Sequence, residues 1–134
     1  MKENIGILLP YKDQFIKDNA GSASIWVKDF SKDSKLKKNT TIFGYTSNVS
    51  KTFDNFNYVN LKFSNFGVQS KNLKYVNKFI DVLNRKKFSL IEIHNRPSYI
   101  LHIEKNLPNQ KYILVIHNNP QTLRGAVTPK ERKH

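Results

Sequence analysis

The stretch FSLIEIHNRP, residues 88–97, decides the fold of this chain. Its first part, residues 88–94, is rich in apolar residues and predicts a strand that runs directly into polar Asn95 and Arg96. Pro97 suits the first turn of a helix, where its missing amide hydrogen costs nothing. The stretch therefore predicts a strand, a polar turn and a helix in direct succession.

The same alternation extends in both directions from this stretch. We expect strands at residues 5–9, 40–44, 58–61, 88–94 and 111–117, and helices at residues 22–30, 72–84 and 97–107. The connections are long enough for right-handed crossovers between parallel strands. The chain is therefore predicted to be an α/β protein, with a Rossmann-like open, mostly parallel sheet and helices on both faces. Its 134 residues suit one domain.

The composition excludes several classes of protein. The chain has no cysteine, so disulfides and thiol catalysis are excluded. The apolar segment near the N-terminus, residues 5–9, is too short for a signal peptide or a membrane span. No G-x-S-x-G motif of a serine hydrolase is present. We expect a cytoplasmic protein, with peripheral contact at the inner membrane face as an additional option.

The formal net charge of +13 allows several interpretations. Lysine and arginine bind nucleic-acid phosphates, and they also favour anionic membrane surfaces or anionic acceptors. The lysines are spread over the whole chain, so a solvated basic surface is favoured over a nucleic-acid site. Phe53, Phe56, Tyr58 and Phe63 could form a stacking platform for single-stranded nucleic acid. We favour the other interpretation, in which they form a core under a long loop.

Polar residues follow the two strands at residues 88–94 and 111–117 in nearly identical order. His94, Asn95, Arg96 and Pro97 follow the first, and the second is followed by His117-Asn118-Asn119-Pro120. In open parallel sheets, ligands bind beyond the carboxyl ends of the strands. The paired tetrads therefore predict a binding site at this edge, although a lone strand-end histidine is more often structural.

A metal site is the rival interpretation of the two histidines, because imidazole is a common metal ligand. Neither histidine has a cysteine or an acidic residue at ligand spacing in the sequence. Glu92 alternates with Ile91 and Ile93 along its strand and is not assigned to the site. The sequence therefore predicts that no metal is bound.

The loop at residues 19–23 opens the first predicted helix. Gly21 lets a ligand approach the backbone, and the helix N-terminus favours an anion such as phosphate. Ser22 also suits an ordinary helix cap. The loop is neither a Walker motif nor a G-x-G-x-x-G motif.

Three stretches together resemble the N-terminal domain of the GT-B fold, family four, retaining glycosyltransferases. The first is ILLP at residues 7–10 with the loop to Gly21 and Ser22. The second is LIEIHNRP at residues 90–97, and the third is ILVIHN at residues 113–118 with the following loop. The loop has one glycine where that family more often has two.

The resemblance implies a role for each site residue. His117 would be the catalytic-cleft residue, contacting the donor sugar or the acceptor near the reacting centre. Gly21 and Ser22 would approach the donor phosphate. The acceptor, or an anionic group on it, would be held by His94, Asn95, Arg96, Asn118, Asn119 and Arg124.

The resemblance also implies what accompanies this domain. We expect residues 1–134 to be a single, incomplete acceptor-side domain that lacks the donor-binding domain and is inactive in transfer by itself. No cofactor or metal is expected, and a nucleotide sugar would be the co-substrate. The expected partners are a sugar acceptor and either the missing donor domain or a second copy of the chain. The alternative is a small basic α/β module that binds nucleic acid, an anionic surface or a partner protein.

Overall fold

The computed structural model of the chain describes residues 3–64 and 66–117. In chain order, the helices and strands are β1 (Ile5–Leu8), α1 (Ser22–Ser31), β2 (Thr40–Gly44), β3 (Asn57–Asn60), α2 (Lys71–Arg85), β4 (Leu90–His94), α3 (Pro97–Asn106) and β5 (Tyr112–Val115). Two short 3₁₀ turns, Lys37–Asn39 and Val49–Lys51, precede β2 and β3. Each predicted strand and helix is present, with ends that differ by at most two residues from the expected ones.

The strands form one sheet in the order β3-β2-β1-β4-β5, and every neighbouring pair is parallel. This confirms the predicted open, Rossmann-like α/β fold. β1 occupies the centre and is buried along its whole length, as expected for a strand covered on both faces. β1, β4 and β5 are shorter than the predicted strands, whereas β2 and β3 have the predicted length.

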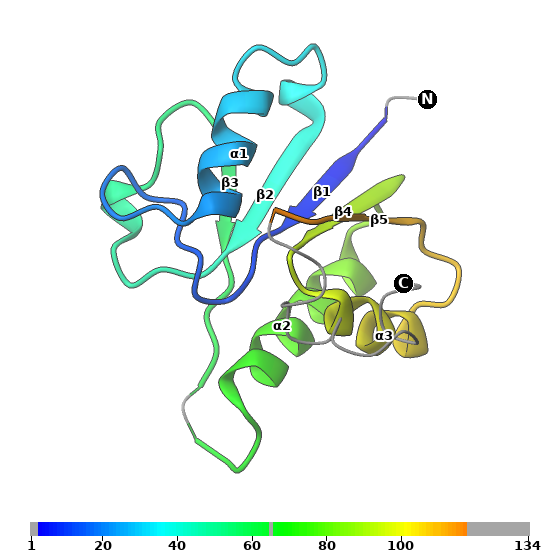
Figure 1. The fold of residues 1–134 in the computed structure, drawn as a ribbon. Helices are drawn as coiled ribbons and strands as arrows, with labels where there is room; N and C mark the ends of the chain where they lie inside the picture. Colours follow the sequence, from blue (N-terminus) through cyan, green and yellow to red (C-terminus); the bar gives the residue numbers. More distant parts are fainter. Residues whose placement is uncertain (1–2, 65, 118–134) are drawn as a thin grey trace.

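Helices cover both faces of the sheet, with α1 on one face and α2 and α3 together on the other (Figure 1). Side chains alternate between the two cores, so Ile7 packs on the α1 side while Leu8 packs on the α2 side. α2 presents an apolar stripe to the sheet that includes Val76, Phe79 and Leu83. In the N-terminal half of α2, Tyr75 is fully buried, and its hydroxyl donates a 2.6 Å hydrogen bond to the carbonyl of Leu9.

The loop after β1 contributes buried apolar side chains to the core. Phe15 is fully buried there, and Ile16 pairs with Thr52 in an isolated antiparallel bridge. Phe53 and Phe56 meet the Phe15 ring edge-on, at centroid distances of 4.8 and 5.3 Å. The expectation that these aromatic side chains form a core under a long loop is therefore confirmed.

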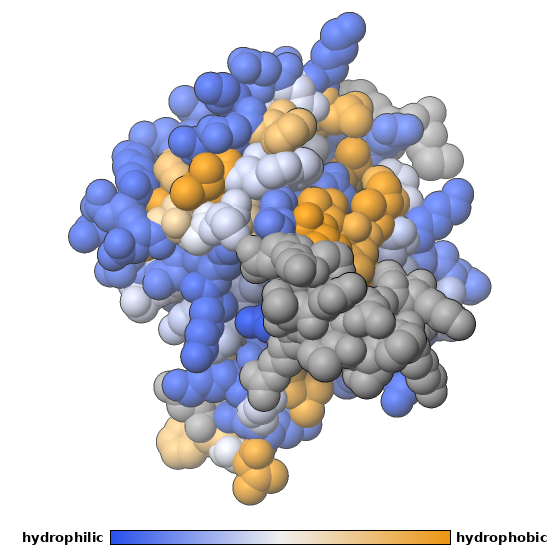
Figure 2. Space-filling model, in the orientation of Figure 1, coloured by the Kyte–Doolittle hydropathy of each residue, from blue (hydrophilic) through white to orange (hydrophobic). Residues whose placement is uncertain are grey.

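Phe63 is partly buried and packs against the rings of Tyr11 and Tyr45. On the face shown in Figure 2, most of the coloured surface is hydrophilic, with separate apolar areas. None of the helices in the described part of the chain has the length and hydrophobicity needed to cross a bilayer.

Candidate functional site

A crevice opens beyond the carboxyl ends of β1 and β4, where the order of the strands reverses. After β1 the chain passes to α1 on one face, and after β4 it passes to α3 on the opposite face. Loops that leave in opposite directions create the usual ligand position of open α/β sheets. A surface pocket of about 340 Å³ lies there, lined by Pro10, Lys12, Asp13, Gly21, Ser22, Asn95 and Arg96.

Two histidines from neighbouring strands meet beside this pocket. The rings of His94 and His117 are stacked, with centroids 5.0 Å apart and an angle of 14° between their planes. Nδ1 of His94 lies 2.8 Å from Nε2 of His117, a hydrogen-bond distance. Trp26 of α1 packs against both rings, at 5.4 and 5.2 Å. The predicted pairing of the two strand-end histidines is therefore present as a direct contact.

An acidic residue does stand beside the histidine pair, contrary to the sequence interpretation. Oε1 of Glu92 lies 3.4 Å from Nε2 of His94, too poorly aligned to count as a hydrogen bond. Residues two apart on a strand share one face, so Glu92 belongs with His94 and not with Ile91 and Ile93. The two-residue spacing of Glu92 and His94 indicates that they share a face of the strand. Leaving Glu92 out of the site because it alternates with Ile91 and Ile93 was therefore wrong.

The carboxylate of Glu92 favours one tautomer of the His94 ring, and that tautomer sets the tautomer of His117. A proton on Nε2 of His94, facing Glu92, makes Nδ1 of that ring an acceptor. Nε2 of His117 is then the donor, and Nδ1 of His117 keeps a lone pair. In this tautomer His94 accepts a hydrogen bond from His117, and the carboxylate of Glu92 lies near the other nitrogen of His94 without a hydrogen bond to it.

Asn95 fixes the turn between β4 and α3. Its backbone has φ of 58°, in the left-handed region that asparagine tolerates better than most residues. Its amide donates to the carbonyl of Val115 at 2.9 Å, and its side-chain oxygen accepts from the amide of His117 at 2.7 Å. Asn95 is buried and also lines the pocket, so it connects the pocket to the histidine pair.

Asp13, which has no role in the sequence interpretation, closes the N-terminus of α1. Its two carboxylate oxygens accept hydrogen bonds from the amides of Ala23 and Ser24, at 3.0 and 3.1 Å. The cap position is held by Gly21, whose missing side chain leaves room for the carboxylate, and Ser22 does not act as the cap. In this structure a carboxylate thus occupies the helix amides that were expected to face a phosphate.

Arg96 adds unused hydrogen-bonding capacity to the pocket. Its Nε is buried and has no acceptor among the described residues. A buried donor without a partner costs stability, and it gains a partner when a ligand with an acceptor binds. Lys12 adds a second cation to the same wall, while Asp13 supplies the opposite charge.

The histidine that was assigned to catalysis is shifted toward its neutral form. Partial burial lowers the pKa of His117, and the neighbouring His94 lowers it further, while Asp13 acts in the opposite direction. A neutral imidazole can accept a proton or a hydrogen bond through its free nitrogen.

The structure brings most of the predicted site residues together. Gly21, Ser22, Asn95 and Arg96 line one pocket, and His94 and His117 adjoin it through Asn95. Asn118, Asn119 and Arg124 lie outside the described residues. No group of three or more histidine, cysteine, aspartate or glutamate side chains in the described part of the chain is placed to bind a metal ion.

Comparisons of the chain with protein-family models, with curated proteins and with solved structures find no match.

Proposed function

We propose that this protein is the acceptor-side part of a glycosyltransferase, and that the pocket beyond β1 and β4 holds a hydroxyl-rich acceptor. The observation that carries this proposal is the convergence of a polar pocket and an oriented histidine pair at the point where the strand order reverses. Asn95 links the two, because it lines the pocket and accepts from the amide of His117.

The lining of the pocket suits sugar hydroxyls, each of which can both donate and accept a hydrogen bond. Arg96 and Lys12 supply donors, and Asp13 supplies the carboxylate acceptor. The unpaired Nε of Arg96 supports an acceptor atom on the ligand, either a hydroxyl oxygen or an anionic group. The mixture of charges favours a polar ligand that is not strongly anionic.

His117 is the residue that we place nearest the reacting centre. Its ring is held by His94 and Trp26, and its pKa is lowered by burial, so it remains neutral near pH 7. A neutral, oriented imidazole can hold a sugar hydroxyl in one position. The donor and the acid–base requirements of transfer would come from a second domain facing this edge.

A donor-phosphate role for Gly21 and Ser22 requires Asp13 to move. The carboxylate of Asp13 already satisfies the amides of Ala23 and Ser24, and it would repel a phosphate placed at the same helix end. We therefore expect this chain to bind simple glycosides more readily than nucleotide sugars.

The test is an NMR titration of the isotope-labelled chain, in which the chemical shifts of the backbone amides and the tryptophan indole are monitored. With methyl glucoside as the probe, shifts are expected at Asn95, Arg96 and the Trp26 indole. The variant Arg96→Gln should weaken binding about tenfold, as expected when a hydrogen bond to a charged group is lost. The variant Lys35→Gln removes the same charge from an exposed position and should bind like the parent chain.

Two results would count against the proposal. Shifts that map away from the pocket would remove the acceptor site, and so would equal weakening by Arg96→Gln and Lys35→Gln. Uridine diphosphate is the comparison ligand. Tight binding of the nucleotide to the unaltered chain would show that this domain serves the donor instead of the acceptor.

A further inference from the structure

The loop between β3 and α2 carries the two most exposed large apolar side chains among the described residues. Phe66 is 89 % exposed and Val68 is fully exposed, on either side of Gly67, whose φ is +98°. The loop projects from the end of the molecule, below the sheet in the view of Figure 1. Apolar atoms lie at this protruding end in the space-filling view as well (Figure 2).

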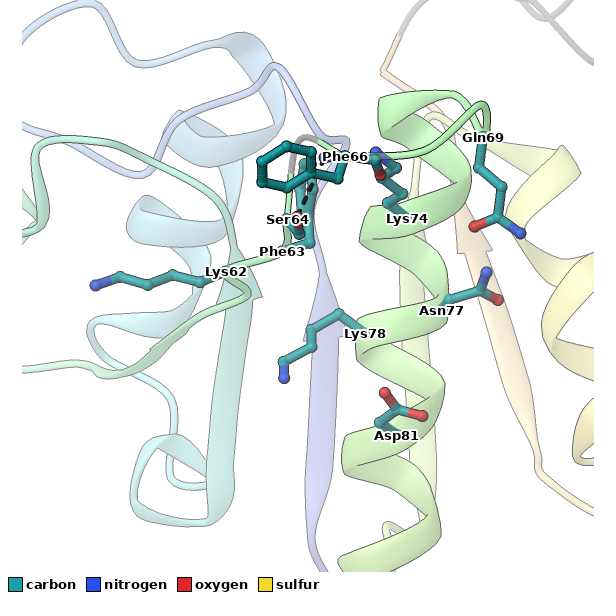
Figure 3. A pocket seen from close by; sticks show the side chains of 9 residues that line it. All are labelled: Lys62, Phe63, Ser64, Phe66, Gln69, Lys74, Asn77, Lys78 and Asp81. Atoms are coloured by element: carbon teal, nitrogen blue, oxygen red, sulfur yellow. Dashed lines mark hydrogen bonds between the residues drawn. The ribbon is translucent and has the colours of Figure 1, made fainter.

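Basic side chains surround the base of this loop. A hollow of about 520 Å³ lies between the loop and α2, and Lys62, Lys74 and Lys78 are among the residues that line it. Figure 3 shows Lys74 and Lys78 projecting from α2 and Lys62 projecting from the segment after β3. None of the three lysines forms an ion pair with a carboxylate in the described part of the chain.

A hydrogen bond connects the loop to the side of α2. The ammonium group of Lys74 donates a hydrogen bond to the backbone carbonyl of Phe66. The hydroxyl of Ser64 accepts from the amide of Phe66 at 3.1 Å, and the hydroxyl of Ser70 caps α2 by accepting from Leu73. Among the described residues, only the Lys74 contact joins the loop backbone to the side of α2, and the side chains of Phe66 and Val68 are exposed beside it.

We propose that this loop docks the protein on an anionic lipid surface. Phe66 and Val68 would enter the interface between headgroups and acyl chains, and the lysine-lined hollow would take a lipid phosphate. Apolar insertion combined with basic neighbours is the usual chemistry of peripheral membrane attachment. This proposal stands apart from the sugar site, because the loop follows β3 and the sugar pocket follows β1 and β4.

A lipid surface explains the loop better than a protein partner does. Two apolar side chains cover far less than the roughly 800 Å² per partner that a stable protein interface buries. A membrane needs no such area, since each lysine near an anionic surface strengthens binding about fivefold. Asp81 is the one acidic side chain that lines the hollow, so the local charge favours lipid phosphates.

The experiment is flotation of the full chain with vesicles of phosphatidylcholine alone or mixed with phosphatidylglycerol. Binding is expected only to the mixed vesicles. The variant with Lys62→Gln and Lys78→Gln should bind about 25-fold more weakly, on the fivefold contribution of each lysine. The control variant with Lys32→Gln and Lys35→Gln removes the same charge from exposed positions near the end of α1 and should lose much less.

A second pair of variants tests insertion of the apolar tip. Phe66→Ser should lower the partition coefficient between vesicles and water at least about tenfold. This fold-change corresponds to the free energy gained when one large apolar side chain is buried. Phe30→Ser removes another exposed phenylalanine, 64 % exposed on α1, and should leave binding unchanged. Phe66 is so exposed that its replacement leaves the core intact, and the circular dichroism spectrum should confirm this.

Three outcomes would overturn the proposal. They are absence of binding to the mixed vesicles, equal loss with the two lysine pairs, and unchanged binding by Phe66→Ser. Soluble glycerol phosphate separates a membrane site from a free phosphate site. Release from the vesicles by glycerol phosphate, but not by sodium chloride at the same ionic strength, would assign the hollow to a soluble ligand instead.

Discussion

Removal of the Asp13 carboxylate should destabilise the protein measurably and should free an anion site at the start of α1. Both oxygens of this side chain accept amide hydrogen bonds, from Ala23 and Ser24. Loss of a helix cap costs about 1 kcal/mol, and loss of a carboxylate near a helix N-terminus costs up to about 1 kcal/mol more. We therefore expect Asp13→Ala to lower the free energy of unfolding by about 2 kcal/mol.

The assay is urea unfolding followed by circular dichroism. With an m value of about 2 kcal/mol per M urea, the midpoint should fall by about 1 M. Asp13→Asn keeps one acceptor oxygen and should lose about half as much. Asp29→Ala is the matched control, because it removes the same charge from an exposed position of α1 that only approaches Lys28, at 3.4 Å. Its effect should stay within about 0.5 kcal/mol.

Added inorganic phosphate gives the second readout. In Asp13→Ala the two amides are free, so phosphate should restore part of the lost stability by binding the folded state. The unaltered chain should gain less, since its own carboxylate occupies the amides. The reasoning would be refuted by equal losses in Asp13→Ala and Asp29→Ala, or by equal phosphate effects on the variant and the unaltered chain.

Three further changes test other parts of the structure. The pKa of His117 is lowered in the folded state, so its contribution to stability is present above the ordinary pKa of about 6.5 and is lost as the pH falls through the lower folded value. Urea midpoints at neutral and mildly acidic pH should show this loss, and His117→Gln should show less of it. Tyr75→Phe removes the buried hydrogen bond to the carbonyl of Leu9 and should cost about 1–2 kcal/mol in the same unfolding assay. Phe15→Ala empties the centre of an aromatic cluster and should cost about 3–5 kcal/mol, whereas exposed Phe30→Ala should cost under about 1 kcal/mol; similar costs for the two would contradict the assigned core.

The fold was predictable because its signals are local. Most of the strands lie in short segments rich in apolar residues, and the helix at residues 71–85 shows its buried stripe in the spacing of its apolar residues. The position of the candidate site was predictable for a related reason, since the carboxyl ends of parallel strands meet at one edge. Two histidines that end neighbouring strands were therefore expected to approach each other, as His94 and His117 do.

The partners of these groups were harder to predict, because they come from positions that no local spacing connects. The side chain of Asp13 caps a helix that begins nine residues later, whereas sequence patterns look for the capping side chain directly at the start of the helix. Phe15 stands among polar residues, and only the tertiary contacts with Phe53 and Phe56 reveal that it is core. The position of Glu92 beside His94 could have been predicted from the sequence, because residues two apart on a strand share a face.

The distribution of charge separates the two sites that we propose. The proposed sugar pocket is lined by two cations, Lys12 and Arg96, and by Asp13, whose carboxylate also accepts from the amides at the start of α1. A strongly anionic ligand gains little there, because it meets that carboxylate where the helix amides would otherwise attract it. The hollow beside the β3–α2 loop has three lysines and one carboxylate, with an apolar tip beside it. In these two proposals, the large positive charge of the chain serves attachment to an anionic surface, and recognition at the sheet edge relies on hydrogen bonds to a polar, weakly charged ligand.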